Sequence, residues 1–214
     1  MFQLTKIWMD QDPGIEMVEL RYLCSPLGEP ARWEGQEEAE VMAVVPNTMP
    51  RVRQAVIEIP RYMNGKDAYQ LHHRFVYVLG GREEFSPIYT DEIVAQEVPY
   101  LDQDGRVTEV RLLWGVNGWT AQNWTQAKLE GLQLQTSPTG PGHDIEGEGI
   151  ADDAIYELIQ TVPLPRRYIA KVWGPRGATV EYVYQLLRTN SPLPDDDFAR
   201  WDNNDLQNYR VALT

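Results

Sequence analysis

Hydrophobic and polar residues alternate with a period of two in short runs along most of this chain. Such runs, rich in β-branched and aromatic residues and bounded by Pro and Gly, are typical of β-strands. Helical spacing of apolar residues is scarce, and only Ala121 to Leu134 is compatible with a turn or two of helix. So many short strands separated by turns predict an all-β protein of the sandwich or barrel kind. The predicted strands are MVELRYLCS from Met17, EVMAVV from Glu40, VRQAVIEI from Val52, QLHHRFVYVL from Gln70, IVAQEVPYL from Ile93, VTEVRLLWGV from Val107, IYELIQTVPL from Ile155, YIAKVW from Tyr168, TVEYVYQLL from Thr179 and NYRVAL from Asn208.

A weak internal repeat relates the two halves of the chain. In each half a strand leads into a loop with a tryptophan, Trp33 or Trp119. A strand ending in Pro-Arg follows, and then an aromatic strand, Phe75-Val76-Tyr77 or Tyr182-Val183-Tyr184. The shared order of these features predicts that the two halves have the same architecture.

The boundary between the halves is expected at residues 101–105, LDQDG, because Asp-Gly is a strong turn signal. Halves of about 100 residues are long enough to bury a core each. We therefore predict two tandem antiparallel β-sandwich modules, residues 1–101 and residues 102–214, each with its own core.

Charge and hydropathy exclude several classes of partner. The chain has 19 basic and 32 acidic residues, a net charge of −13, which argues against binding nucleic acid or anionic lipid. No apolar run reaches the roughly 18 residues that a membrane helix needs. The first residues lack the pattern of a secretory signal, and Cys24, the single cysteine, permits no internal disulfide. These features predict a cytoplasmic protein outside the membrane.

The sequence offers no motif for catalysis and none for a cofactor. No nucleophile elbow, phosphate loop, dinucleotide fingerprint or zinc spacing occurs. The acidic runs Glu83-Glu84 and Asp195-Asp196-Asp197 are typical of solvated turns, whereas glycosidases need two carboxylates held across a cleft. We therefore expect a protein that is not an enzyme by itself.

His72 and His73 are adjacent in a predicted strand, where consecutive side chains point to opposite faces. They are therefore not expected to share a metal ion. We expect one of them to pack against the core and the other to lie at the surface, and we predict no metal site.

The sharpest local feature is the run WDNNDLQNY from Trp201 to Tyr209. Asp and Asn bond to nearby backbone N–H groups and tolerate left-handed conformations, so the run predicts a loop or hairpin between strands. Flat aromatic rings beside amide groups suit a sugar, which has apolar ring faces and hydroxyl edges. The alternative is a tight turn with a buried aromatic residue.

This run resembles the W-D-N-N-x-x-x-N-Y signature of starch- and glycogen-binding modules, the immunoglobulin-like β-sandwich modules of amylases, starch synthases and glycogen-targeting phosphatase subunits. The resemblance extends from about Val107 to Leu213, and VTEVRLLWGVNGWT resembles the opening strand and asparagine-tryptophan loop of these modules. It implies an Ig-like second module that binds α-glucan, and with the internal repeat it gives two tandem Ig-like antiparallel β-sandwich modules. The implied site residues are Trp201 and Trp119, which would stack on glucose rings, and Asn203 and Asn208, which would hydrogen-bond hydroxyls.

In the first half, Phe85-Ser86-Pro87-Ile88-Tyr89 stands in the place of the signature and has no asparagine, so the sugar site is expected in the second half alone. Trp114, Trp119 and Trp124 cluster near that site, and some of them are expected to reach the surface. Two functions remain open: a non-catalytic α-glucan-binding protein, and a non-catalytic accessory or scaffold subunit that holds a protein partner on the same sandwich surfaces.

Overall fold

The computed structural model describes residues 1–33, 35–103, 105–131, 162–188 and 201–214. Within these ranges every regular element is a β-strand, which confirms the all-β prediction. No helix in the described part of the chain is long and apolar enough to cross a membrane. The fifteen strands are β1 (Phe2–Met9), β2 (Ile15–Pro26), β3 (Glu38–Val41), β4 (Ala43–Val45), β5 (Val52–Ile59), β6 (Tyr69–Leu79), β7 (Arg82–Phe85), β8 (Tyr89–Asp102), β9 (Val107–Val116), β10 (Asn123–Gln126), β11 (Lys128–Leu129), β12 (Arg166–Pro175), β13 (Thr179–Arg188), β14 (Trp201–Asp202) and β15 (Tyr209–Ala212).

Two local expectations differ from the structure or fall outside it. The segment compatible with helix contains β10 and β11 instead, because its polar and apolar residues alternate and pair with β9 and β12. Most of the strand expected from Ile155 lies outside the described residues.

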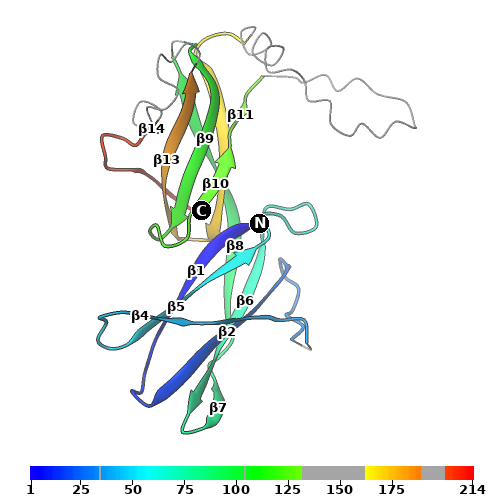
Figure 1. The fold of residues 1–214 in the computed structure, drawn as a ribbon. Coiled ribbons are helices and arrows are strands. Elements are labelled where there is room, and N and C mark those ends of the chain that lie inside the picture. The colour runs from blue at the N-terminus through cyan, green and yellow to red at the C-terminus, as the bar shows by residue number, and fades with distance from the viewer. Residues whose placement is uncertain (34, 104, 132–161, 189–200) are drawn as a thin grey trace, which may run out of the picture.

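The strands form three antiparallel sheets. A three-stranded sheet has the order β1-β5-β4, and a five-stranded sheet has the order β10-β9-β13-β14, with β15 also paired to β13. The third sheet has seven strands in the order β11-β12-β8-β6-β2-β3, with β7 paired to β6. Figure 1 shows two lobes, one built around β1 to β7 and the other around β9 to β15, with β8 running between them.

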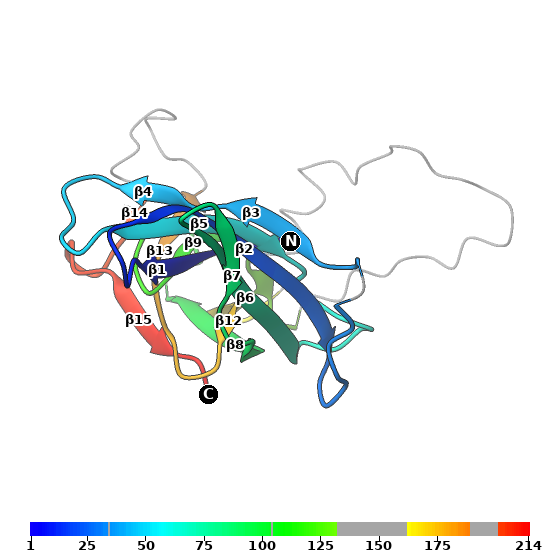
Figure 2. The same cartoon turned by 90° about the horizontal axis from the view of Figure 1, so that it is seen from below.

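Strand alternation places the core between the sheets. In β5, for example, Arg53, Ala55, Ile57 and Ile59 are buried, whereas the residues between them are partly or fully exposed. In Figure 2, which looks along the molecule from below, β4 and β5 lie to one side of β6 and β8. The arrangement is that of a β-sandwich, with the three-stranded sheet over one end of the seven-stranded sheet.

The long strand β8 belongs to both lobes. Its first residues, Tyr89 to Ile93, pair with β6, and its residues from Ile93 to Asp102 pair with β12. A single sheet therefore crosses the boundary that the sequence places after Leu101. Two tandem modules with separate cores, residues 1–101 and 102–214, are not confirmed, because the final strand of the expected first module completes the second lobe.

Side chains also join the two lobes. The rings of Phe2 and Trp114 lie 5.8 Å apart, and those of Trp114 and Trp173 lie 6.4 Å apart. Asn123 accepts a hydrogen bond from the backbone N–H of Gln3 at 2.6 Å and donates one to its carbonyl at 3.0 Å. The buried residues thus form one continuous core.

A buried ion pair lies at a core-facing position of β5. Arg53 is 4% exposed, and its Nε lies 3.0 and 3.2 Å from the two carboxylate oxygens of Asp10, which is 7% exposed. The Nη2 atom of Arg53 donates to Asp10 at 3.1 Å and to the carbonyl of Ile15 at 2.9 Å. The guanidinium therefore ties the turn after β1 and the start of β2 to β5, and each buried charge has its counter-charge.

Candidate functional site

The WDNN run forms a turn between two strands that both pair with β13. Trp201 pairs with Gln185 and Asp202 with Tyr184, after which the chain turns and β15 begins at Tyr209. Positive φ angles of 52°, 54° and 70° place Asn204, Asp205 and Leu206 in the left-handed region of backbone conformation. Asn and Asp adopt this conformation at little cost, and their presence explains the turn. The prediction of a loop between strands is confirmed.

Asn203 and Asn208 stabilise the turn from within. The side-chain Oδ1 of Asn203 accepts a hydrogen bond from the N–H of Leu206 at 3.1 Å, and its backbone carbonyl accepts one from the N–H of Asn208 at 3.0 Å. Both asparagines are partly exposed. Within the described residues no hydrogen bond engages the Nδ2 of Asn203, so its two N–H groups remain for a ligand.

Tyr209 anchors the turn to the sheet. Its hydroxyl donates to Asp202 Oδ1 at 2.9 Å, and its ring stacks on that of Tyr182 with centroids 5.4 Å apart. Burial and the hydrogen bond to Asp202 raise the pKa of Tyr209 to about 12. Tyr209 therefore acts as a neutral structural donor.

Register places Trp201 at the end of a row of side chains on the outer face of the five-stranded sheet. Trp201 pairs with Gln185, Gln185 with Arg111, and Arg111 with Gln126. Residues directly opposite each other on antiparallel strands project to the same face. Trp124, two residues before Gln126, shares that face.

The indole rings of Trp124 and Trp201 meet over this face, with centroids 5.8 Å apart and planes tilted by 45°. Trp124 is 46% exposed, and Trp201 is partly exposed. A hollow of about 570 Å³ beside them is lined by Arg111, Trp124, Thr125, Gln126 and Gln185. We call this surface, with Trp201, the tryptophan face.

The structure does not bring Trp119 to this face. Trp119 lies in the loop after β9, and the last residue of β9, Val116, pairs with Val180. Trp201 pairs with Gln185, five residues further along β13, which is about 17 Å at the rise of a β-strand. The asparagine-tryptophan loop therefore lies at a different end of the sheet from Trp201, and Trp124 takes the expected place of Trp119.

The alternation of side chains along β10 indicates that Trp124 points outward. Thr125 points inward and accepts a hydrogen bond from the indole N–H of buried Trp114 at 3.0 Å. Its neighbours Trp124 and Gln126 must then point outward. Which strand β10 pairs with, and hence that Trp124 meets Trp201, could be learned only from the fold.

The chemistry of the tryptophan face suits a neutral ligand with apolar faces and hydroxyl edges. Gln126 and Gln185 can each donate and accept hydrogen bonds. Arg111 pairs with Glu109, with Nε and Oε1 2.5 Å apart, so its charge is balanced on the protein. Two tilted indole rings present a broad apolar surface.

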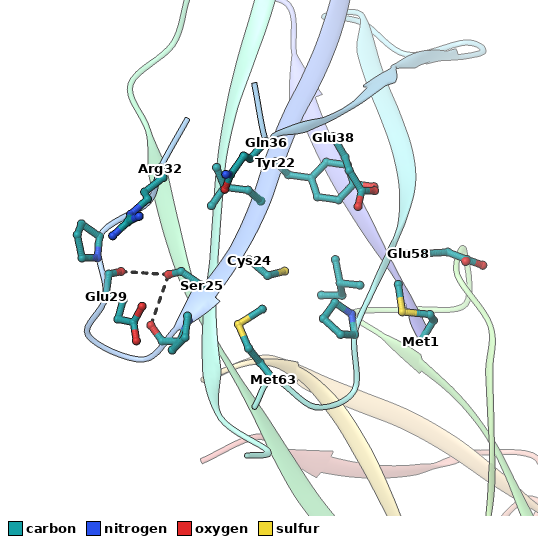
Figure 3. A pocket seen from close by; sticks show the side chains of 15 residues that line it. Met1, Tyr22, Cys24, Ser25, Glu29, Arg32, Gln36, Glu38, Glu58 and Met63 are labelled. Atoms are coloured by element: carbon teal, nitrogen blue, oxygen red, sulfur yellow. Dashed lines mark hydrogen bonds between the residues drawn. The ribbon is translucent and has the colours of Figure 1, made fainter. Parts of the chain in front are cut away.

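A second hollow, of about 500 Å³, lies in the other lobe beside the end of β2 (Figure 3). It is lined by three acidic residues, Glu29, Glu38 and Glu58, and by Arg32. Cys24 also lines this hollow, but burial raises the pKa of its thiol to about 12, so this thiol stays protonated and is a poor nucleophile. None of the lining residues belongs to the tryptophan face.

His72 and His73 diverge, as strand alternation predicts. His72 has its Nε2 2.9 Å from Ser25 Oγ and its Nδ1 3.0 Å from Thr90 Oγ1. His73 lies on the opposite face of β6, where its ring stacks on that of Tyr89. The expectation that one of them lies at the surface is wrong: both are buried, and the ring of His72 lies between Ser25 of β2 and Thr90 of β8.

The remaining acidic candidates add no site. Glu83 and Glu84 lie on β7 and are exposed, and Asp195-Asp196-Asp197 lies outside the described residues. Among the residues that the structure describes, no group of three or more His, Cys, Asp or Glu side chains could hold a metal ion.

No family model, no curated protein and no solved structure matches this chain.

Proposed function

We propose that this protein is a non-catalytic α-glucan-binding protein that binds its ligand on the tryptophan face. The observation that carries the proposal is the ring pair of Trp124 and Trp201 on an outer sheet face, 5.8 Å apart and beside two glutamine amides. The resemblance of residues 201–209 to the starch-binding signature supports the same ligand class.

In this proposal the two indole rings stack on successive glucose units. The tilt of 45° between them suits a curved chain better than a flat one. Gln126 and Gln185 hydrogen-bond hydroxyls along one edge of the sugar. The Nδ2 of Asn203 donates to a hydroxyl at the rim, while its Oδ1 continues to hold the turn.

The expected affinity is low for a short oligosaccharide. Each stacked ring contributes about 1 kcal/mol, and each net hydrogen bond contributes about as much. Two rings and three amides, less the cost of immobilising the ligand, correspond to a Kd of roughly millimolar to high-micromolar. On a polymer, neighbouring sites raise the effective concentration and make such weak binding sufficient.

Titration with maltoheptaose, followed by tryptophan fluorescence, tests the proposal. We expect wild type to saturate, and Trp201→Ala and Trp124→Ala to lose about five- to tenfold in affinity, since each removes one stacking ring. Trp119→Ala is the matched control and should bind as wild type does. Circular dichroism checks that each variant remains folded. A wild-type protein that gives no response up to about 10 mM oligosaccharide contradicts the proposal.

A second candidate function is that of an accessory or scaffold subunit that holds a protein partner. It is favoured by the outer face of the three-stranded sheet, where Ile7, Met9 and Val56 are 64%, 49% and 38% exposed. Exposed apolar patches of this kind often mark protein contacts. The same titration discriminates the two candidates, because a scaffold alone gives no response to the oligosaccharide.

A further inference from the structure

A further hollow, of about 430 Å³, adjoins β10 next to the tryptophan face. Arg61 and Tyr62, which follow β5, line it from the first half of the chain. The second half contributes β10, β11 and Trp173 of β12. We call it the inter-lobe hollow, because both lobes build its wall.

Two buried donors on this wall have no partner. Trp173 is 2% exposed, and its indole Nε1 makes no hydrogen bond. The Nε of Arg61 is likewise buried and unpaired. By contrast, the indole N–H of neighbouring Trp114 is satisfied by Thr125. Buried donors are nearly always paired in folded proteins, so two unpaired donors on residues that line the same hollow indicate that an acceptor is missing beside it.

The rest of the wall resembles the tryptophan face in chemistry. The ring of Tyr62 is 51% exposed and stands edge-on to that of Trp173 at 5.6 Å, and the Arg61 guanidinium covers the Trp173 ring at 5.1 Å. Lys171 pairs with Asp67 at 2.7 Å, and Glu130 pairs with Arg167 at 3.1 Å. Arg61, Lys128 and Glu97 also line the hollow and are of both signs, so the wall has no excess of acidic groups that would favour a cation. Its aromatic surface and many hydrogen-bonding groups suit a polyol.

The inter-lobe hollow is continuous with the tryptophan face. Thr125 and Gln126 line both hollows. In addition, Arg61 Nη2 donates to the backbone carbonyl of Trp124 at 2.6 Å. A chain that stacks on Trp124 can therefore pass round β10 and reach Tyr62.

We propose that the inter-lobe hollow is a second glucan subsite, which holds the continuation of the chain bound at the tryptophan face. The ligand stacks on Tyr62. Its hydroxyl oxygens accept from Trp173 Nε1 and Arg61 Nε after the Arg61 side chain turns away from the Trp173 ring that it covers, because both donor atoms are enclosed before the ligand binds. This inference rests on the proposed function, and it assigns a binding role to residues of both halves of the chain.

The test compares maltotriose, which is too short to occupy both subsites, with maltoheptaose. Tyr62→Ala should weaken maltoheptaose binding about fivefold and leave maltotriose binding unchanged, because one ring of the second subsite is lost. Phe85→Ala is the matched control, since Phe85 is also an aromatic residue of the first half and is 50% exposed. This variant should bind both sugars as wild type does. The indole N–H resonance of Trp173 should shift with maltoheptaose and not with maltotriose.

The outcomes separate the two proposals. If Tyr62→Ala binds both sugars as wild type does and the Trp173 resonance stays in place, the second subsite is overturned while glucan binding stands. Equal weakening of both sugars also overturns it, because Tyr62 would then belong to the first subsite. If wild type binds neither sugar, the proposed function fails and the subsite fails with it.

Discussion

Replacing Arg53 with methionine should lower the free energy of unfolding by about 3 to 5 kcal/mol, the usual cost of breaking a buried ion pair from one side. The variant leaves the Asp10 carboxylate, which is 7% exposed, without the guanidinium that now makes three hydrogen bonds to it. It also removes one of two donors to the carbonyl of Ile15, that of Arg53 at 2.9 Å, while Arg51 Nη1 still donates at 3.2 Å. Urea unfolding at neutral pH measures the effect.

Arg51→Met is the control for this prediction. Arg51 Nη1 lies 3.7 Å from Asp10, but its side chain is 45% exposed, so we expect a loss below about 1 kcal/mol. The double variant Asp10→Leu with Arg53→Met removes both charges and should recover most of the stability. Equal losses for Arg53→Met and Arg51→Met would show that the buried pair does not stabilise this lobe.

Stability should also fall steeply in mild acid because of His73. Burial first, and then the charge of Lys6, lower the pKa of His73 to about 4, while Asp91 opposes the shift; burial also lowers the pKa of His72. The geometry agrees with a neutral ring, because Asp91 is in contact with Lys6, whereas His73 Nδ1 lies 3.6 Å from Asp91 and makes no hydrogen bond.

Proton linkage gives the direction in which the free energy of unfolding changes with pH. Between the ordinary histidine pKa of about 6.5 and a pKa of about 4, the unfolded chain binds a proton that the native protein does not. The free energy of unfolding therefore decreases as the pH falls through this window, by about 3 kcal/mol from this residue.

His73→Phe removes the titration and keeps the ring contacts with Phe75 and Tyr89. The variant should have nearly the stability of wild type at pH 7 and a shallower loss towards pH 4. Carboxylates also titrate in acid, so the informative quantity is the difference between the two curves of unfolding free energy against pH. Parallel curves would refute a role for His73.

Strand patterns were predictable because they are local. The alternation in VRQAVIEI sets the inward face of β5, and the Asp and Asn residues of WDNNDLQNY set the turn, whatever the rest of the fold does. The strand with which a given strand pairs is not determined by such local patterns. The polar and apolar alternation of residues 93–102 is compatible with pairing to strands of either lobe. The sequence alone therefore could not show that β8 pairs with both β6 and β12.

Some residues of the candidate site could be predicted from local sequence, and others depend on strand pairing. Trp201 and Asn203 were recognisable from their own short motif. Trp124 was not chosen over Trp119, because the choice depends on the pairing of β10 with β9 and of β9 with β13. The burial of His72 likewise depends on contacts with Ser25 and Thr90, which are 47 and 18 residues away in the chain.

The most direct test of the account is the set of seven tryptophan indole N–H resonances, recorded by NMR while maltotriose is added. Single Trp→Phe variants assign each resonance. The tryptophan face predicts that the resonances of Trp124 and Trp201 shift together and saturate, while those of Trp119 and the buried Trp114 stay in place. Shifts at Trp119 without shifts at Trp124 and Trp201, or no shift at any tryptophan up to about 10 mM, would contradict the central claim.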